Sequence, residues 1–162
     1  MKSIPTIALA ALVLIGLAAG CGKPAAETSR AAPPPKHEHK PPHGGTPVVL
    51  GDEVYHVELV LDAASGKLQA YVFDGELENF IRSSVPSIEI DATIAGAPQA
   101  LVLHAVANPA TGETVGDTSL FEGQAEWLKN NREFDATLKS ITVRGTTFSD
   151  VKFNFPKGND KD

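Results

Sequence analysis

After its proline-rich N-terminal part, the chain is a series of short apolar segments separated by turn residues. The clearest segment is 54–61, in which the apolar residues Val57 and Leu59 alternate with the polar residues His56 and Glu58. A period of two places one set toward a core and leaves the other leaning toward solvent, as in a half-buried strand. This pattern limits the chain to a fold built from strands.

Further segments of the same kind follow, and turns rich in Gly, Asp and Ser connect them. Residues 62–67 predict the loop of a hairpin. The expected strands are 48–50, 54–61, 68–73, 87–94, 100–107, 135–144 and 147–155. Only residues 75–82 and 123–131 favour a helical turn. Strands at this spacing predict an all-β fold over residues 46–156, a single β-sandwich of seven or eight strands with immunoglobulin-like architecture.

A possible internal repeat relates residues 73–80 to residues 121–128. The repeat predicts two related halves, each with a strand that leads into a helical turn. The last apolar residue of each turn, Phe80 or Leu128, would then plug one end of the core. The alternative is that any sheet protein with short connections produces such similarities.

The N-terminus carries a separate pattern. Lys2 supplies an early positive charge, and residues 7–19 form an unbroken apolar run. The run is shorter than the roughly 20 residues that a membrane span needs, and its length suits the apolar region of a signal peptide. We therefore expect residues 1–20 to be removed.

The run ends in Leu17-Ala18-Ala19-Gly20-Cys21, which resembles the lipobox of bacterial lipoproteins. The resemblance implies that Cys21 is acylated and attaches the chain to a membrane, facing the periplasm. Gly22 after the cysteine implies the outer membrane where the source has two. Cys21 is the only cysteine and has no disulfide partner, which agrees with modification. The alternative is an ordinary secretory signal that happens to contain a cysteine.

The segments on either side of the domain have compositions that do not build a core. Residues 21–45 are rich in proline and lack aromatic residues, so we expect a disordered, semi-rigid tether. Residues 157–162 are expected to form a disordered acidic tail. Removal of residues 1–20 takes away one lysine and no acidic residue, so the formal net charge moves from −6 to −7. This charge excludes nucleic acid as a partner and leaves membrane attachment to the lipid anchor.

Patterns of catalytic residues are missing from the sequence. Cys21 is consumed by acylation, and no Gly-x-Ser-x-Gly motif presents a serine nucleophile. Neighbouring carboxylates such as Asp52 and Glu53 are usually solvated in an acidic protein. We therefore predict that the protein is not an enzyme.

Three histidines crowd into seven residues of the tether: His37, His39 and His43. In an extended chain, side chains two residues apart project to the same side, so the first two could approach one Zn²⁺ or Cu²⁺ ion. His56 and Glu58 on the first long strand are candidates for further ligands. The alternative is a flexible linker that binds metal without biological consequence.

The same region carries a second resemblance. Pro42-His43-Gly44-Gly45-Thr46, together with the strand that follows, resembles the Pro-His-Gly-Gly segments of some periplasmic adaptor proteins of heavy-metal efflux pumps and of small lipoproteins. The likeness covers residues 37–75. It implies a small domain that buffers or passes a metal ion, with His43 as the carried-over position, His56 as its partner residue, and an efflux component as a possible partner protein. The chain lacks the long coiled-coil hairpin of the adaptors.

A second function also fits the pattern: an interaction module that binds another envelope protein or a glycan and has no metal role. Such surfaces use exposed aromatic residues as anchors, and the candidates are Tyr55, Tyr71 and Trp127. The strand pattern places Tyr55 on the core side, and Trp127 is expected to face inward. His104 is isolated in an apolar strand, which favours a structural role.

Overall fold

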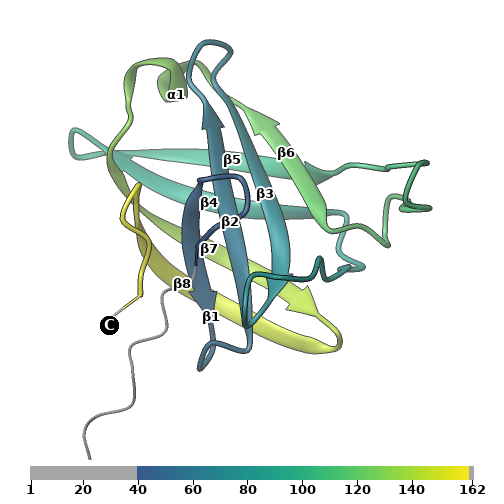
Figure 1. The fold of residues 1–162 in the computed structure, drawn as a ribbon. Helices are drawn as coiled ribbons and strands as arrows, with labels where there is room; N and C mark the ends of the chain where they lie inside the picture. Colours follow the sequence, from purple (N-terminus) through teal and green to yellow (C-terminus); the bar gives the residue numbers. More distant parts are fainter. Residues whose placement is uncertain (1–39, 161–162) are drawn as a thin grey trace, which may run out of the picture. The chain divides into compact units, whose positions relative to one another are not determined.

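The computed structural model describes residues 40–160, which form eight strands and one short helix (Figure 1). The elements are β1 (Thr46–Leu50), β2 (Tyr55–Asp62), β3 (Lys67–Asp74), β4 (Ser87–Ile94), β5 (Ala97–Ala105), β6 (Leu120–Gln124), α1 (Glu126–Asn130), β7 (Phe134–Val143) and β8 (Thr146–Phe155).

All eight strands belong to one antiparallel sheet in the order β1-β2-β3-β6-β5-β4-β7-β8. The sheet curls until β1 and β8, its two edge strands, come into contact, so it is nearly closed into a barrel (Figure 1). Closure of this kind reduces the exposed edges that an open sheet would present.

The core lies inside the curled sheet and follows from the alternation along each strand. In β4, for example, Ile88 and Ile90 are buried while Glu89 and Asp91 face outward. The buried apolar side chains of the described chain all lie between Val48 and Phe155. Because these side chains form one core within residues 40–160, we expect a fragment that contains these residues to fold independently.

The predicted all-β class and the number of strands are confirmed, while the arrangement differs from two separate packed sheets. β6, which was not predicted, pairs with β3 on one side and β5 on the other. It therefore joins strands β1 to β3 to the remaining four strands of the sheet. Its sequence, Leu-Phe-Glu-Gly-Gln, has little strand character. Gly123 is required there because a Cβ would lie 2.5 Å from the carbonyl oxygen of Val102 on the neighbouring strand.

The helical predictions were partly wrong. Residues 75–82 form turns in which the Asp74 carboxylate accepts hydrogen bonds from the backbone of Glu78 and Asn79, and such side-chain bonds compete with a helix. Within the predicted helix 123–131, β6 takes the first residues and α1 is short. Within residues 40–160 no helix has the length and apolar character that a membrane span requires.

The two segments of the proposed internal repeat also differ. The first contains no helix, and the second includes the start of α1. Leu128 is buried in the core as expected, whereas Phe80 is 54% exposed and lies outside it. The repeat is therefore not reflected in the structure.

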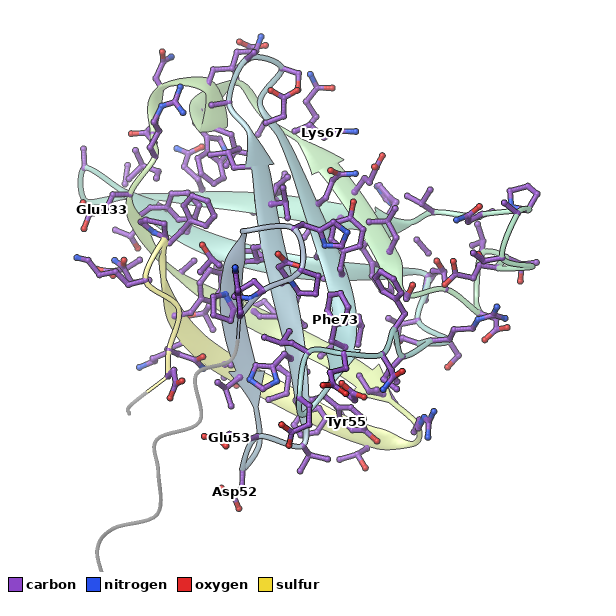
Figure 2. The ribbon with its side chains drawn as sticks, in the orientation of Figure 1. Asp52, Glu53, Tyr55, Lys67, Phe73 and Glu133 are labelled. Carbon is purple, nitrogen blue, oxygen red and sulfur yellow. The ribbon has the colours of Figure 1, made fainter. Side chains whose placement is uncertain are left out.

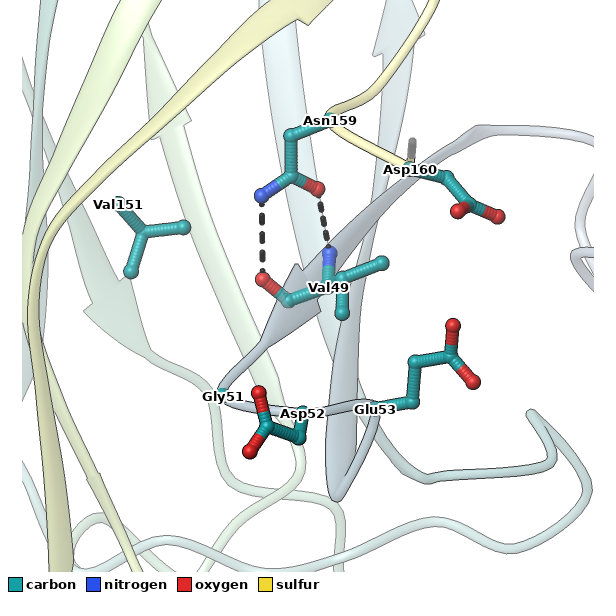
Figure 3. Close-up of a pocket in the computed structure, with 7 residues that line it drawn as sticks. All are labelled: Val49, Gly51, Asp52, Glu53, Val151, Asn159 and Asp160. Carbon is teal, nitrogen blue, oxygen red and sulfur yellow. Dashed lines mark hydrogen bonds between the residues drawn. The ribbon is translucent and has the colours of Figure 1, made fainter. Parts of the chain in front are cut away.

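The start of the predicted C-terminal tail is ordered and closes the sheet, which corrects the prediction for residues 157–160. Asn159 accepts a hydrogen bond from the Val49 N–H at 2.7 Å and donates one to the Val49 carbonyl at 3.2 Å (Figure 3). The backbone of Gly158 also pairs with Asn154 on β8. The side-chain amide thus supplies the edge of β1 with the partner that a ninth strand would have provided.

We expect Asn159→Ala to lower the free energy of unfolding by about 1–2 kcal/mol, because the Val49 N–H loses its partner. Urea unfolding followed by circular dichroism measures this loss. Asn130→Ala is the matched control, since Asn130 is exposed and no hydrogen bond of its side chain is seen in the described structure. Equal stability of the two variants would contradict the role given to Asn159.

Candidate functional site

The Pro-His-Gly-Gly segment begins with a β-turn. The Gly44 N–H donates to the Pro41 carbonyl at 3.0 Å, so Pro42 and His43 occupy the two central positions. Proline at the second position and glycine at the fourth are typical of such turns. Gly44 has a φ of +68°, a conformation that glycine adopts without strain. The turn therefore follows directly from the local sequence.

The turn covers Glu58 of β2, whose carboxylate is fully buried. One carboxylate oxygen, Oε1, accepts hydrogen bonds from the backbone N–H groups of His43 at 2.8 Å and Gly45 at 2.9 Å. The other, Oε2, lies 2.7 Å from Nδ1 of the His43 ring. Both oxygens are thus engaged by the same short segment, which satisfies a buried charge that would otherwise be strongly unfavourable.

Gly45 allows the segment to approach β2 this closely. A Cβ at this position would lie 2.5 Å from the Leu59 carbonyl oxygen and 2.9 Å from Cγ2 of Val60. The two glycines of the motif therefore have different functions. Gly44 permits the turn, and Gly45 permits the backbone contact.

The His43 ring lies on an aromatic surface formed by β3 and the loop after it. It stacks on Tyr71 with ring centroids 4.0 Å apart and an angle of 14° between the ring planes. The ring centroids of Phe73 and Phe80 lie 6.2 and 6.1 Å from that of His43. The strand register explains this grouping, because Glu58 is paired with Tyr71 across β2 and β3. Burial raises the pKa of the Tyr71 phenol. Phe73 is labelled in Figure 2.

These contacts determine which atom of His43 is available. An ionised carboxylate only accepts hydrogen bonds, so with Glu58 ionised Nδ1 carries the hydrogen and the neutral ring has its lone pair on Nε2. The His43 side chain is 35% exposed. The ring is therefore fixed on one edge and one face, and the lone pair of Nε2 has the chemistry of a metal ligand.

His56 and Glu58 do not lean toward solvent as predicted. His56 is 1% exposed, and its Nδ1 lies 3.4 Å from the Asp74 carbonyl. The prediction was wrong because residues 43–45 cover Glu58, while His56 lies against the end of β3, so both side chains are buried. His104, for which a structural role was expected, is instead exposed on β5.

Of the predicted site residues, the structure brings together His43 and Glu58. Cys21, His37 and His39 lie outside the described residues. Within residues 40–160, no group of three or more His, Cys, Asp or Glu side chains is arranged to hold a metal ion. Asp52, Glu53 and Asp160 all line a cavity of about 590 Å³ beside β1, but their carboxylates do not form such a group either (Figure 3).

The His43–Glu58 pair has the chemistry of a metal-ligand histidine with its supporting carboxylate. Histidine ligands in proteins usually donate their second ring N–H to a carboxylate or carbonyl, which fixes the tautomer and the ring orientation. A single imidazole needs further ligands, because Zn²⁺ takes three or four from a protein. Comparisons of the chain with protein-family models, curated proteins and solved structures found no match.

Proposed function

We propose that this protein is a lipid-anchored lipoprotein of the cell envelope whose domain binds Zn²⁺ or Cu²⁺, with His43 as the fixed ligand. One observation carries the proposal: Nδ1 of His43 is held by a fully buried carboxylate, while the side chain as a whole is 35% exposed and no hydrogen bond of Nε2 is seen in the described structure. The role is binding or buffering of the ion, without catalysis. The membrane location rests on the lipobox resemblance at Cys21.

Glu58 is proposed to orient the ligand rather than to bind the ion itself. Both of its oxygens accept hydrogen bonds from residues 43–45, so direct coordination would require these bonds to break. Outer carboxylates of this kind typically change metal affinity 10- to 100-fold.

The remaining ligands are proposed to be His37 and His39, which precede His43 by six and four residues in the sequence. An ion held by this set would sit where the tether joins the domain. His56 receives no ligand role in this proposal, because an ion could reach a residue that is 1% exposed only after local rearrangement.

Calorimetric titration of a fragment 22–162 with ZnSO₄ or CuCl₂ tests the proposal. We expect a dissociation constant below about 10 μM for at least one ion, since imidazole ligands suit both metals. We expect His43→Ala to weaken binding at least about tenfold. His104→Ala is the matched control, because His104 is an exposed histidine on β5, which is separated from β3 by β6.

Binding weaker than about 10 μM for both ions would refute the proposal. So would equal affinity of the His43→Ala and His104→Ala variants. Loss of affinity in a His37→Ala, His39→Ala double variant would support the ligand set, whereas unchanged affinity would exclude those two residues.

A further inference from the structure

A cavity of about 270 Å³ opens beside the aromatic surface, and neither His43 nor Glu58 is among its lining residues. The rings of Tyr71 and Phe80 and the side chain of Leu120 form an apolar wall. Arg82, Asn108 and Glu113 contribute polar groups to the lining of the same cavity. None of these polar groups takes part in the proposed metal site.

The apolar wall contains an aromatic ring that is exposed but fixed. Phe80 is 54% exposed, although large apolar side chains are usually buried. Its ring stacks on buried Phe73 with centroids 4.6 Å apart, and its backbone forms a bridge to the same residue. Next to it, Tyr71 is held by its stack with His43. These rings therefore form a preformed platform and lose little freedom when a ligand packs on them.

The polar side is also fixed in place. Arg82 donates from Nη1 to Asp117 at 2.9 Å and from Nη2 to the Thr111 carbonyl at 2.6 Å. Glu113 accepts hydrogen bonds from the N–H and the hydroxyl of Ser119 at 2.8 and 2.7 Å, and from the Thr111 hydroxyl at 2.7 Å.

The charges at this cavity are compensated within the protein. Burial alone would raise the pKa of Glu113, but the hydrogen bonds from Ser119 and Thr111 and the charge of Arg82 bring it below its usual value. Glu113 is therefore ionised at neutral pH. Because Arg82 already faces two carboxylates, Asp117 and Glu113, it does not make the cavity a site for an anion.

We propose that this cavity binds one uncharged pyranose ring of a glycan. The C–H face of a sugar ring carries a slight positive charge and packs on the negative face of an aromatic ring, here Phe80 and Tyr71. The hydroxyl groups at the sugar edge need both donors and acceptors. The amide of Asn108 and the guanidinium of Arg82 supply donors, and the carboxylate of Glu113 supplies an acceptor.

The size of the cavity agrees with a ligand of one ring. Ligand pockets commonly have volumes of about 300–1,000 Å³, and the volume of this cavity is slightly below that range, as a small ligand requires. We expect a dissociation constant of about 1–10 mM, because a ligand of a dozen heavy atoms gains limited free energy. This proposal does not require a bound metal ion, although Tyr71 lines the cavity and also stacks on His43.

Two-dimensional ¹H–¹⁵N NMR of the fragment 22–162 tests the proposal with maltose, lactose and chitobiose as probes, each at about 20 mM. At least one disaccharide is expected to shift the amide signals of Tyr71, Phe80, Arg82 and the 108–113 loop. Phe80→Ala should weaken that binding at least about tenfold. Val102→Ala, which truncates an exposed apolar side chain outside the cavity, should leave it unchanged.

Three results would overturn the proposal: no shift with any disaccharide, shifts outside the cavity, or equal binding by Phe80→Ala and the parent. Tighter binding of glucuronate than of the neutral sugars would also overturn it and would assign an anion site to Arg82. If Phe80→Ala loses its dispersed spectrum, Asn108→Ala replaces it, since Asn108 is exposed. We expect that variant to weaken binding about threefold, and unchanged binding would contradict the proposal.

Discussion

Replacement of Glu58 by Gln is expected to weaken binding of Zn²⁺ or Cu²⁺ by about 10- to 100-fold. The reason is the tautomer of His43. The two backbone N–H groups at Oε1 favour the amide oxygen of the glutamine there, which leaves the amide NH₂ opposite Nδ1 of His43. An NH₂ group donates, so Nδ1 would have to accept and the hydrogen would move to Nε2. The nitrogen proposed as the ligand would then no longer have a free lone pair.

Two measurements check this prediction. Long-range ¹H–¹⁵N NMR of the histidine rings reports the tautomer, and calorimetry reports metal affinity. Because an ionised acceptor is lost, we also expect a decrease of about 1–3 kcal/mol in the free energy of unfolding. Glu89→Gln on β4 is the matched control, since Glu89 is exposed and its replacement changes the net charge equally. An unchanged His43 tautomer with full metal affinity would contradict the role of Glu58.

The positions of most strands could be predicted from the sequence because alternation is a local property. The limits of β4 agree with the prediction to the residue, and those of β2, β3, β7 and β8 agree within one residue. β6 was missed because Gly123 and its polar neighbours interrupt the apolar pattern. Its place in the sheet depends on backbone pairing with β3 and β5, and that pairing leaves little trace in five residues.

Closure of the sheet could not be predicted for a related reason. It depends on contacts between residues far apart in the chain, such as the hydrogen bonds between Asn159 and Val49. The polar sequence of residues 157–162 has the composition of a free tail. Composition does not reveal that one amide side chain matches the exposed edge of β1.

The candidate site was predicted in part. His43 and Glu58 were both identified as candidate ligands, but the sequence does not show that a turn brings them together across 15 positions. The sequence also does not distinguish a buried glutamate that orients a histidine from an exposed glutamate that binds the ion. The contribution of Phe80 was also missed, because a helical turn in residues 75–82 would have placed it in the core.

The structure explains the residues of the Pro-His-Gly-Gly segment by their structural role, which does not depend on a metal ion. The turn, the two backbone N–H groups and the His43 ring all converge on one carboxylate. The end of the expected tether is therefore part of the domain from residue 40 onward. Any ion bound at Nε2 of His43 would be attached to a rigid surface rather than to a free chain.

Replacement of Gly45 by Ala is expected to lower the free energy of unfolding by at least about 3 kcal/mol and to weaken metal binding. The new Cβ would lie 2.5 Å from the backbone oxygen of Leu59, which cannot move without disturbing β2. The turn would have to lift away, and Glu58 would lose two hydrogen bonds to backbone N–H groups, each worth about 1.5–3 kcal/mol to a charged acceptor. Urea unfolding and calorimetry measure the two effects.

Gly44→Ala separates this contact from the turn itself. A Cβ at Gly44 meets nothing within 4 Å, so this variant is destabilised only by its left-handed backbone, by about 1–2 kcal/mol. A loss from Gly45→Ala no larger than this would refute the close-approach explanation. The double variant Gly45→Ala, Glu58→Gln adds a stricter condition. Gly45→Ala withdraws the two backbone N–H groups, and Glu58→Gln removes the charge of the acceptor that they bond. Since both changes weaken the same contact, the loss in the double variant should be clearly smaller than the sum of the two single losses, whereas full additivity would mean that Gly45 and Glu58 act independently.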